Sequence, residues 1–203
     1  MRDFILHFIR HGETLANQEG KYIGKTDLVL TSDSVEELEN LREEGIYPKV
    51  SVVYSSPLSR CVQTAKTIYP DKQLIAVENL CEYDFGEYEG KTDAELSSRE
   101  DYVAWRAGKL DRAAGGESME EFKSRIYAGL VQIVKNMSEQ EVYDAAIITH
   151  GGVIMTLFSL CGLPQAQAVN WACENGKGYT ARVNMSIFSR SGYIEIVGTV
   201  PEC

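Results

Sequence analysis

Basic side chains are scarce in this chain. Its 203 residues include 20 Lys and Arg against 30 Asp and Glu, which gives a formal net charge of −10. A nucleic-acid backbone or an anionic membrane binds a basic face, so we expect neither as the main partner. A small anionic ligand is compatible with this charge, because a pocket can be locally positive and exposed charge is largely screened beyond about 8 Å at physiological salt.

Paired cysteines and long apolar runs are also missing. The five cysteines are spread along the sequence and none forms a Cys-x-x-Cys pair, which gives little support to a zinc or redox site. We expect free thiols in a reducing compartment. The apolar run near the start contains His7 and is too short for a signal peptide or a membrane span. We therefore expect a cytoplasmic protein, and we expect His7 to be a hydrogen-bonded core histidine.

Four short apolar runs predict strands that are buried on both faces. They cover residues 4–9, 50–54, 74–77 and 145–149. Amphipathic segments lie between these runs, and the alternation predicts an α/β fold, a three-layer αβα sandwich with a mainly parallel central sheet. No repeat, low-complexity stretch or linker interrupts residues 1–203, so we expect a single domain.

Three serines mark the expected starts of helices. Ser34 and Ser118 each precede a glutamate by three positions, which is the pattern of a capping box. Ser56 precedes Pro57, a favoured first helical residue, and should open a helix that ends near residue 68. After Ser118, apolar residues spaced by three and four predict the clearest amphipathic helix of the chain. These residues are Met119, Phe122, Ile126, Leu130, Ile133 and Met137.

Two further segments complete the expected fold. Residues 92–117 are polar, and we expect short helices around their aromatic residues that form a cap-like insertion. Residues 183–188 and 193–197 are separated by a Ser-Gly pair, which predicts a closing β-hairpin.

Five chemically versatile side chains follow the predicted strands. Arg10 and His11 follow the first strand, and Arg60 lies in the first turn of the helix after the second. Glu82 follows the third strand and His150 the fourth. Because ligands of such sheets bind outside the carboxyl ends of the strands, we expect these five side chains to share one site.

The chemistry of this set suits a phosphomonoester. Arg10 and Arg60 could clamp phosphate oxygens with planar, permanently charged guanidinium groups. Backbone N–H groups at Gly12 and Gly151 lie at expected helix starts, which favour anions. These features predict a phosphate pocket.

The three remaining side chains could carry out the reaction itself. Neutral His11 could attack phosphorus and form a phosphohistidine. A protonated His150 would stabilise the charge of the transferring group. Glu82 could protonate the leaving oxygen and then deprotonate the attacking water, provided that the arginines do not hold its pKa too low.

These residues lie in five ordered blocks that resemble the histidine phosphatase superfamily, whose fold is also called phosphoglycerate mutase-like. The first block, Phe-Ile-Arg-His-Gly-Glu-Thr, ends at Thr14 and continues in residues 20–31, and the others cover residues 55–65, 80–90, 115–118 and 149–152. One departure is the segment after Leu30-Thr31, which lacks the family's usual Gly-x-x-Gln-Ala continuation.

The resemblance implies a role for each matching residue. His11 is then the phosphorylated nucleophile and Glu82 the proton donor, whereas Arg10, Arg60 and His150 hold the phosphoryl group. Asn17 is implied to contact a phosphate oxygen, and Gly151 to bind phosphate through its backbone. Tyr22, Ile23, Gly24 and Tyr83 are expected to line the substrate pocket. Neither a metal nor an organic cofactor is implied.

The preferred function is hydrolysis of a small phosphorylated metabolite. The chain is shorter than the cofactor-dependent mutases and its region 92–117 is compact, which favours a phosphatase similar to α-ribazole phosphatases or broad-specificity bacterial phosphatases. A phosphoglycerate-type phosphomutase is the second hypothesis, and a non-catalytic phosphate-binding module is a third, of another class. The leaving group and the oligomeric state stay open.

Overall fold

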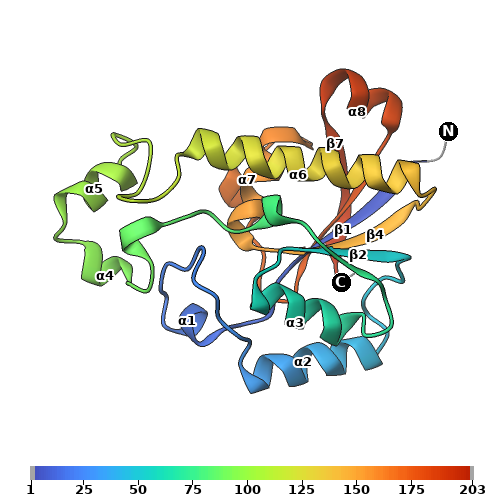
Figure 1. Ribbon diagram of the computed structural model, residues 1–203, viewed down its shortest axis with the longest axis horizontal. Coiled ribbons are helices and arrows are strands. Elements are labelled where there is room, and N and C mark those ends of the chain that lie inside the picture. The colour runs from blue at the N-terminus through green and yellow to red at the C-terminus, as the bar shows by residue number, and fades with distance from the viewer. Residues whose placement is uncertain (1–2, 202–203) are drawn as a thin grey trace.

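The computed structural model describes residues 3–201, which contain a seven-stranded sheet in the order β3-β2-β4-β1-β6-β7-β5 (Figure 1). The bounds of the strands are β1 Phe4–Arg10, β2 Val52–Ser55, β3 Leu74–Ala76, β4 Asp144–Thr149, β5 Gly162–Leu163, β6 Gly178–Val183 and β7 Ile194–Val200. Strands β1 to β4 are parallel to one another, as are β5 and β7, whereas β6 is antiparallel to both of its neighbours. The predicted α/β fold with a mainly parallel sheet is confirmed.

Helices cover both faces of this sheet (Figure 1). Helices α6 (Met119–Glu139) and α7 (Gly151–Cys161) lie on one face, and α2 (Ser32–Glu43) and α3 (Ser59–Ile68) lie on the other. The shorter helices are α1 Leu15–Gln18, α4 Asp93–Leu96, α5 Glu100–Arg106 and α8 Met185–Ser191. Among residues 3–201, no helix combines the length and the apolar character that a bilayer span requires.

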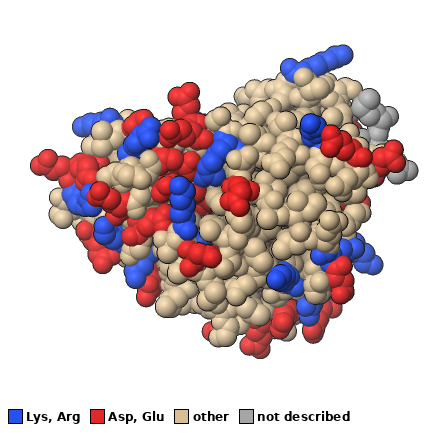
Figure 2. All heavy atoms as spheres, viewed as in Figure 1, with Lys and Arg blue, Asp and Glu red and all other residues tan. Residues whose placement is uncertain are grey.

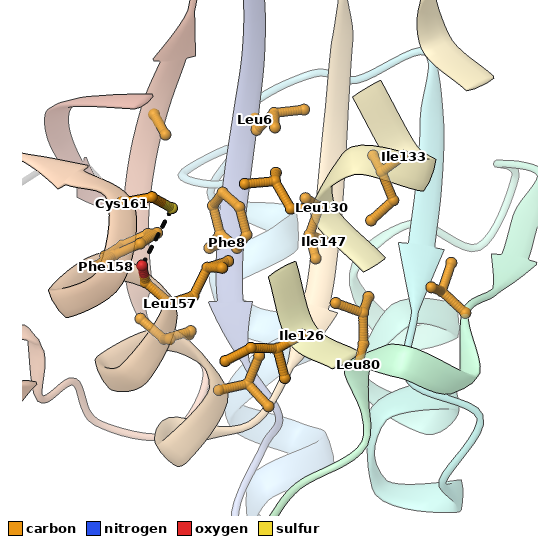
Figure 3. Packing of buried hydrophobic residues seen from close by; sticks show 14 of the residues in the cluster. Leu6, Phe8, Leu80, Ile126, Leu130, Ile133, Ile147, Leu157, Phe158 and Cys161 are labelled. Atoms are coloured by element: carbon orange, nitrogen blue, oxygen red, sulfur yellow. Dashed lines mark hydrogen bonds between the residues drawn. The ribbon is translucent and has the colours of Figure 1, made fainter. Parts of the chain in front are cut away.

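The core is divided by the sheet, because successive side chains of a strand point to opposite faces. On the α6 and α7 face, Phe8 of β1 packs in one buried cluster with Ile126 and Phe158 (Figure 3). The next residue, Ile9, belongs to a second cluster with Leu38 of α2. Burial of one such side chain contributes roughly 1.5–3 kcal/mol, so the two clusters hold the strand ends in place.

Of the three predicted helix starts, only the one at Ser118 is confirmed. Its side chain accepts a hydrogen bond from Glu121 N, and the Glu121 carboxylate binds Ser118 N in return. Met119 is nevertheless 42% exposed, so the apolar stripe of α6 begins three residues later, at Phe122.

The predictions for Ser34 and Ser56 are wrong. Helix α2 starts earlier, with Thr31 as its N-cap, and the Ser34 hydroxyl accepts a hydrogen bond from Glu13 N. Helix α3 starts later, after Leu58, while the Ser56 side chain contacts His150. In both cases the serine side chain has a partner far away in the sequence and therefore does not act as the cap.

The predicted closing hairpin is also wrong, because α8 lies between β6 and β7. The Asn184 side chain accepts hydrogen bonds from Ser186 N and Ile187 N and caps the start of α8. Gly192 ends the helix with φ of 73°, in the left-handed region that glycine adopts readily. These two caps outweigh the alternating pattern of residues 183–188, and β6 pairs with β7 instead.

Residues 92–117 contain the expected short helices, α4 and α5. Both project beyond the end of the sheet (Figure 1), and Tyr102 and Trp105 of α5 pack against Tyr88. Figure 2 shows that charged side chains of both signs gather over this end of the molecule. The surface of α4 and α5 is therefore polar, while their aromatic residues turn toward the main core.

Candidate active site

The two His-Gly turns meet because β1 and β4 are adjacent and parallel. Their register pairs Arg10 with Thr149, so the next residues, His11 and His150, leave the sheet side by side. The ring centroids are 5.2 Å apart, and His11 is 5% and His150 0% exposed. Two imidazoles 139 positions apart therefore share one buried site, as expected from the parallel topology.

His11 is held in one tautomer. Its Nδ1 lies 2.6 Å from the carbonyl oxygen of Gly12, which only accepts, so Nδ1 carries the hydrogen and Nε2 keeps its lone pair. Burial, followed by the positive charge of Arg60, lowers the pKa of His11 to about 3. At neutral pH this imidazole is uncharged and has a nucleophilic nitrogen.

His150 also lies in surroundings that favour a neutral ring. The Arg60 Nε–H group donates to His150 Nδ1 at 3.3 Å, so the other ring nitrogen, Nε2, donates to Ser56 Oγ at 2.9 Å. Burial, the nearby His11 and the charge of Arg60 lower the pKa of His150 well below its ordinary value. Two buried cations placed this close would repel each other.

Both arginines hold a positive charge without a carboxylate beside it. Arg60 is 1% exposed and donates to the carbonyl oxygens of Thr26 at 2.9 Å and Gly24 at 2.8 Å. Arg10 donates to the Cys173 carbonyl at 2.8 Å, while its Nε is buried with no hydrogen-bond partner. Within residues 3–201 neither guanidinium lies within 4.0 Å of a carboxylate oxygen. Buried charges are normally paired, so this arrangement suits an anion.

Glu82 is buried and accepts two backbone hydrogen bonds. Tyr83 N donates to one carboxylate oxygen at 2.9 Å, and Gly152 N donates to the other at 2.9 Å. A Cβ atom at Gly152 would lie 2.3 Å from Glu82 Oε1, so only glycine permits this approach. Burial raises the pKa of Glu82 and outweighs the hydrogen bonds and the charges of Arg60 and Arg10, which lower it. Desolvation thus opposes the lowering of the Glu82 pKa by the nearby arginines.

The Asn17 side chain is engaged within its own helix. Its Oδ1 accepts from Thr14 N at 3.0 Å and closes the capping box of α1. Asn175, which sequence reasoning missed, donates to the carbonyl oxygens of His11 at 2.9 Å and Gly12 at 3.2 Å. Asn175 precedes Gly176, which indicates only a turn, so the sequence carried no signal for this contact.

Ser56 and Gly151 complete the immediate surroundings of the two rings. Ser56 is fully buried and orients His150, although its sequence context indicated a helix cap. Gly151 begins α7, and a Cβ atom there would lie 3.4 Å from Arg10 Nε. The first turn of this 11-residue helix therefore lies beside the Arg10 side chain, and its Gly152 N–H group donates to Glu82.

Of the expected pocket residues, Tyr22 lies where the loop between α1 and α2 meets α5. Its hydroxyl is 2.7 Å from the Tyr102 hydroxyl and accepts from Arg106 Nη1 at 3.0 Å. Its ring packs against Phe85 and Trp105. Tyr22 thus connects this loop with α5.

The other expected pocket residues are closer to Arg60. The Gly24 carbonyl accepts from Arg60, and a Cβ atom at Gly24 would lie 2.0 Å from the Tyr83 carbonyl oxygen. Tyr83 is 4% exposed, and its hydroxyl donates to the Glu117 carbonyl at 2.5 Å. Ile23 is half-buried between these segments. Gly24 therefore requires the absence of a side chain, and Tyr83 contributes mainly to packing.

The sulfur atoms form no metal-binding group. Cys61, Cys81, Cys161 and Cys173 are free, as expected, and Cys203 lies outside the described residues. In the part of the chain that the structure describes, no three His, Cys, Asp or Glu side chains are placed to hold a metal ion.

Acidification should destabilise the protein through His11. The folded pKa is about 3 against an ordinary 6.5, so between these values the unfolded chain binds more protons, and stability is lost as the pH falls. From pH 7 to pH 5, the free energy of unfolding of the wild type should decrease by about 2 kcal/mol more than that of His11→Gln. Urea titrations at both pH values measure this difference, and equal decreases in the two proteins would contradict it.

The fold and the site together define an α/β protein with a buried, histidine-centred site, flanked by two arginines, at the carboxyl edge of its sheet. Residues 6–186 match the family model of the histidine phosphatase superfamily (branch 1), and the chain belongs to this superfamily. Among curated relatives, the adenosylcobalamin/alpha-ribazole phosphatase of Escherichia coli K12 is 29% identical over 179 residues, which are 84% of this chain and 86% of that protein. Phosphoglycerate mutase-like protein 4 of Arabidopsis thaliana is 30% identical over 158 residues, which are 74% and 67%.

Solved structures show the same fold. The alpha-ribazole phosphatase of Shigella flexneri superposes with a TM-score of 0.77 at 22% identity, covering 96% of this chain and 95% of that one. The phosphoglycerate mutase of Bacillus anthracis superposes with a TM-score of 0.74 at 20% identity, covering 99% and 94%. The expected phosphoglycerate mutase-like fold is confirmed.

Proposed function

We propose that the protein is a phosphomonoesterase that hydrolyses a small phosphorylated metabolite through a phosphohistidine on His11. One observation carries this proposal: neutral His11, with Nε2 as its free nitrogen, is buried beside two guanidinium groups that have no carboxylate partner among residues 3–201. A nucleophile requires the lone pair, and a phosphate dianion supplies the missing negative charge. Relatives named as phosphatases support the same activity.

In the first step Arg10, Arg60 and the N–H group of Gly151 bind the phosphoryl oxygens. His11 Nε2 attacks phosphorus, the bond to the leaving oxygen breaks, and protonated Glu82 gives its proton to that oxygen. The His11 Nδ1–H group keeps its bond to the backbone while the ring becomes positively charged. The negative phosphoryl group also favours protonation of His150, which then stabilises the developing charge.

The second step regenerates the enzyme. Ionised Glu82 takes a proton from water, the resulting oxygen attacks phosphorus, and the bond from phosphorus to His11 breaks. Inorganic phosphate leaves, and His11 returns to its neutral form. Burial raises the pKa of Glu82, so a larger fraction of the carboxyl groups keeps the proton that the first step requires.

We also propose which residues surround the substrate, how the chain is organised and where the protein is located. Asn17 would contact a phosphate oxygen through its amide nitrogen, because its Oδ1 is engaged in α1. Tyr22, Ile23, Gly24 and Tyr83 would bound the substrate space, and we propose that residues 1–203 form a single domain with 92–117 as its cap. Free thiols among the described cysteines fit a cytoplasmic location.

The proposal is tested by following labelled phosphate. The enzyme is given a 32P-labelled alkyl phosphate together with glycerate as an acceptor. Release of inorganic phosphate, with acid-labile label on the protein during turnover, supports the phosphatase. Label transferred to glycerate would indicate a phosphomutase, and an enzyme that neither turns over nor retains label would be a binding module.

Removal of metals should leave this activity unchanged. The site residues supply nucleophile, charge and proton donor themselves, so kcat after EDTA treatment and gel filtration should stay within about twofold of the untreated value. Phosphate release before and after treatment measures this. Loss of activity that a divalent cation restores would overturn the mechanism.

A further inference from the structure

We infer that Arg125 is a positioning residue for the proton donor Glu82, acting through the backbone of the segment that carries it. This inference rests on the proposed function. Arg125 lies on α6, and its guanidinium donates to the carbonyl oxygens of Asn79 at 3.2 Å, Cys81 at 2.6 Å and Glu82 at 2.8 Å. The same group binds the Glu117 carboxylate through Nε at 2.9 Å and Nη2 at 2.5 Å.

Apart from the N–H groups that bind the Glu82 carboxylate, Arg125 supplies the hydrogen bonds to the backbone carbonyls of Cys81 and Glu82. Residues 81–85 belong to no helix or strand, so no ladder of backbone hydrogen bonds fixes them. Thr149 holds the preceding carbonyl, at Leu80, with a bond of 2.8 Å. Among the hydrogen bonds of the described residues, only those from Arg125 reach the next two carbonyls, at Cys81 and Glu82. A rigid planar group that binds both carbonyls sets where the Glu82 side chain begins.

Glu117, which pairs with Arg125, binds the residues that follow Glu82. Its carboxylate accepts from Asp84 N at 2.9 Å, and its carbonyl accepts from the Tyr83 hydroxyl. The side chains of Glu117 and Arg125 are only 14% and 23% exposed, so their attraction is less screened than that of a surface pair. The pair therefore holds the segment on both sides of the proton donor.

If Arg125 positions the acid, the loss of rate in an Arg125 variant should depend on the leaving group. If Arg125 only supports the fold, the loss should be the same for all leaving groups. An alkyl leaving group requires a proton as it departs, whereas 4-nitrophenolate, with a pKa of about 7, departs without one. A displaced Glu82 should therefore slow attack on an alkyl phosphate and spare attack on 4-nitrophenyl phosphate. The affinity for inorganic phosphate, which Arg10 and Arg60 determine, should not change.

The experiment compares Arg125→Met, Arg125→Lys and Glu117→Gln with the wild type and with Glu82→Gln. For Arg125→Met we expect kcat/KM for glycerol phosphate to fall about 10- to 100-fold, while that for 4-nitrophenyl phosphate changes less than about threefold. Arg125→Lys keeps the charge and should recover part of the loss, and Glu117→Gln should change kcat/KM in the same direction by less. The inhibition constant of phosphate should stay within about twofold throughout.

Arg112→Met is the matched control. Arg112 lies near the same end of α6 and, within residues 3–201, pairs with Asp111 and Glu121 and not with residues 79–82. We expect wild-type kinetics for both substrates. If Arg125→Met does not fold, Arg125→Lys and Glu117→Gln still give the leaving-group comparison.

Three outcomes decide the question. Equal losses on both substrates, or no loss on the alkyl phosphate, overturn the inference for Arg125. If Glu82→Gln shows the leaving-group dependence and the Arg125 variants do not, only this inference fails. If Glu82→Gln itself lacks that dependence, the proton donor of the proposed function and the role of Arg125 fail together.

Discussion

Replacement of His11 by alanine should lower kcat/KM by roughly 10⁴-fold or more, the effect expected when the nucleophile of a covalent mechanism is removed. Both ring nitrogens of His150 and Nδ1 of His11 are engaged in hydrogen bonds. Of the four ring nitrogens of these two histidines, only Nε2 of His11 is therefore free to attack phosphorus. Phosphate release from 4-nitrophenyl phosphate measures the loss. Acid-labile 32P, trapped by rapid quenching of the wild type, should be absent from His11→Ala.

His7→Ala is the control for this substitution. His7 lies in the same strand, is 9% exposed and contacts Thr180 Oγ1 through Nδ1 at 2.9 Å, as expected for a core histidine. Its loss should reduce stability but leave kcat within about twofold, because it has no part in the proposed chemistry. A phosphorylated His11→Ala protein, or comparable kcat losses in the two variants, would place the nucleophile elsewhere.

Glu82→Gln should have the second largest effect, a decrease in kcat/KM of about 10²- to 10³-fold on alkyl phosphates. Glutamine retains the shape of the side chain but has no proton to give to the leaving oxygen. In the wild type, burial raises the pKa of Glu82, so the protonated form persists closer to neutral pH and is lost as the pH rises through that value. The plot of kcat/KM against pH should therefore decline on its alkaline side, and this decline should vanish in Glu82→Gln.

Glu78→Gln provides the comparison for this effect. Glu78 is an exposed carboxylate four residues earlier, so its replacement changes the net charge by the same amount as Glu82→Gln. We expect its pH profile and its kcat/KM to match those of the wild type. An alkaline decline that persists in Glu82→Gln would assign the titrating group to another residue.

The convergence of the site was predictable because it follows from chain order. Runs of apolar residues marked β1 and β4, and a parallel sheet brings the carboxyl ends of its strands to one edge. His11 and His150 therefore had to emerge close together once the two strands were paired. The capping box of Ser118 was equally predictable, because both of its hydrogen bonds join residues three positions apart.

Features that depend on distant partners were not predictable in the same way. Ser34 and Ser56 have the local appearance of helix caps, yet their hydroxyl groups bind Glu13 N and His150. Helix α8 replaced a strand because the caps at Asn184 and Gly192 outweighed an alternating apolar pattern. The pattern of residue types in a segment indicates which secondary structures it can adopt. The tertiary contacts decide which of these is present in the folded protein.

The order of residues along the chain was by itself sufficient to place arginine, histidine and glutamate at the ends of buried strands, because strand formation depends on local apolar runs. Only the tertiary structure decided their chemical state. Burial keeps both imidazoles neutral and raises the pKa of Glu82, and these effects come from side chains and backbone that are remote in the sequence. The Arg125 clamp on Glu82 is of the same kind, since it joins residues 43 positions apart that meet only when α6 packs on the sheet.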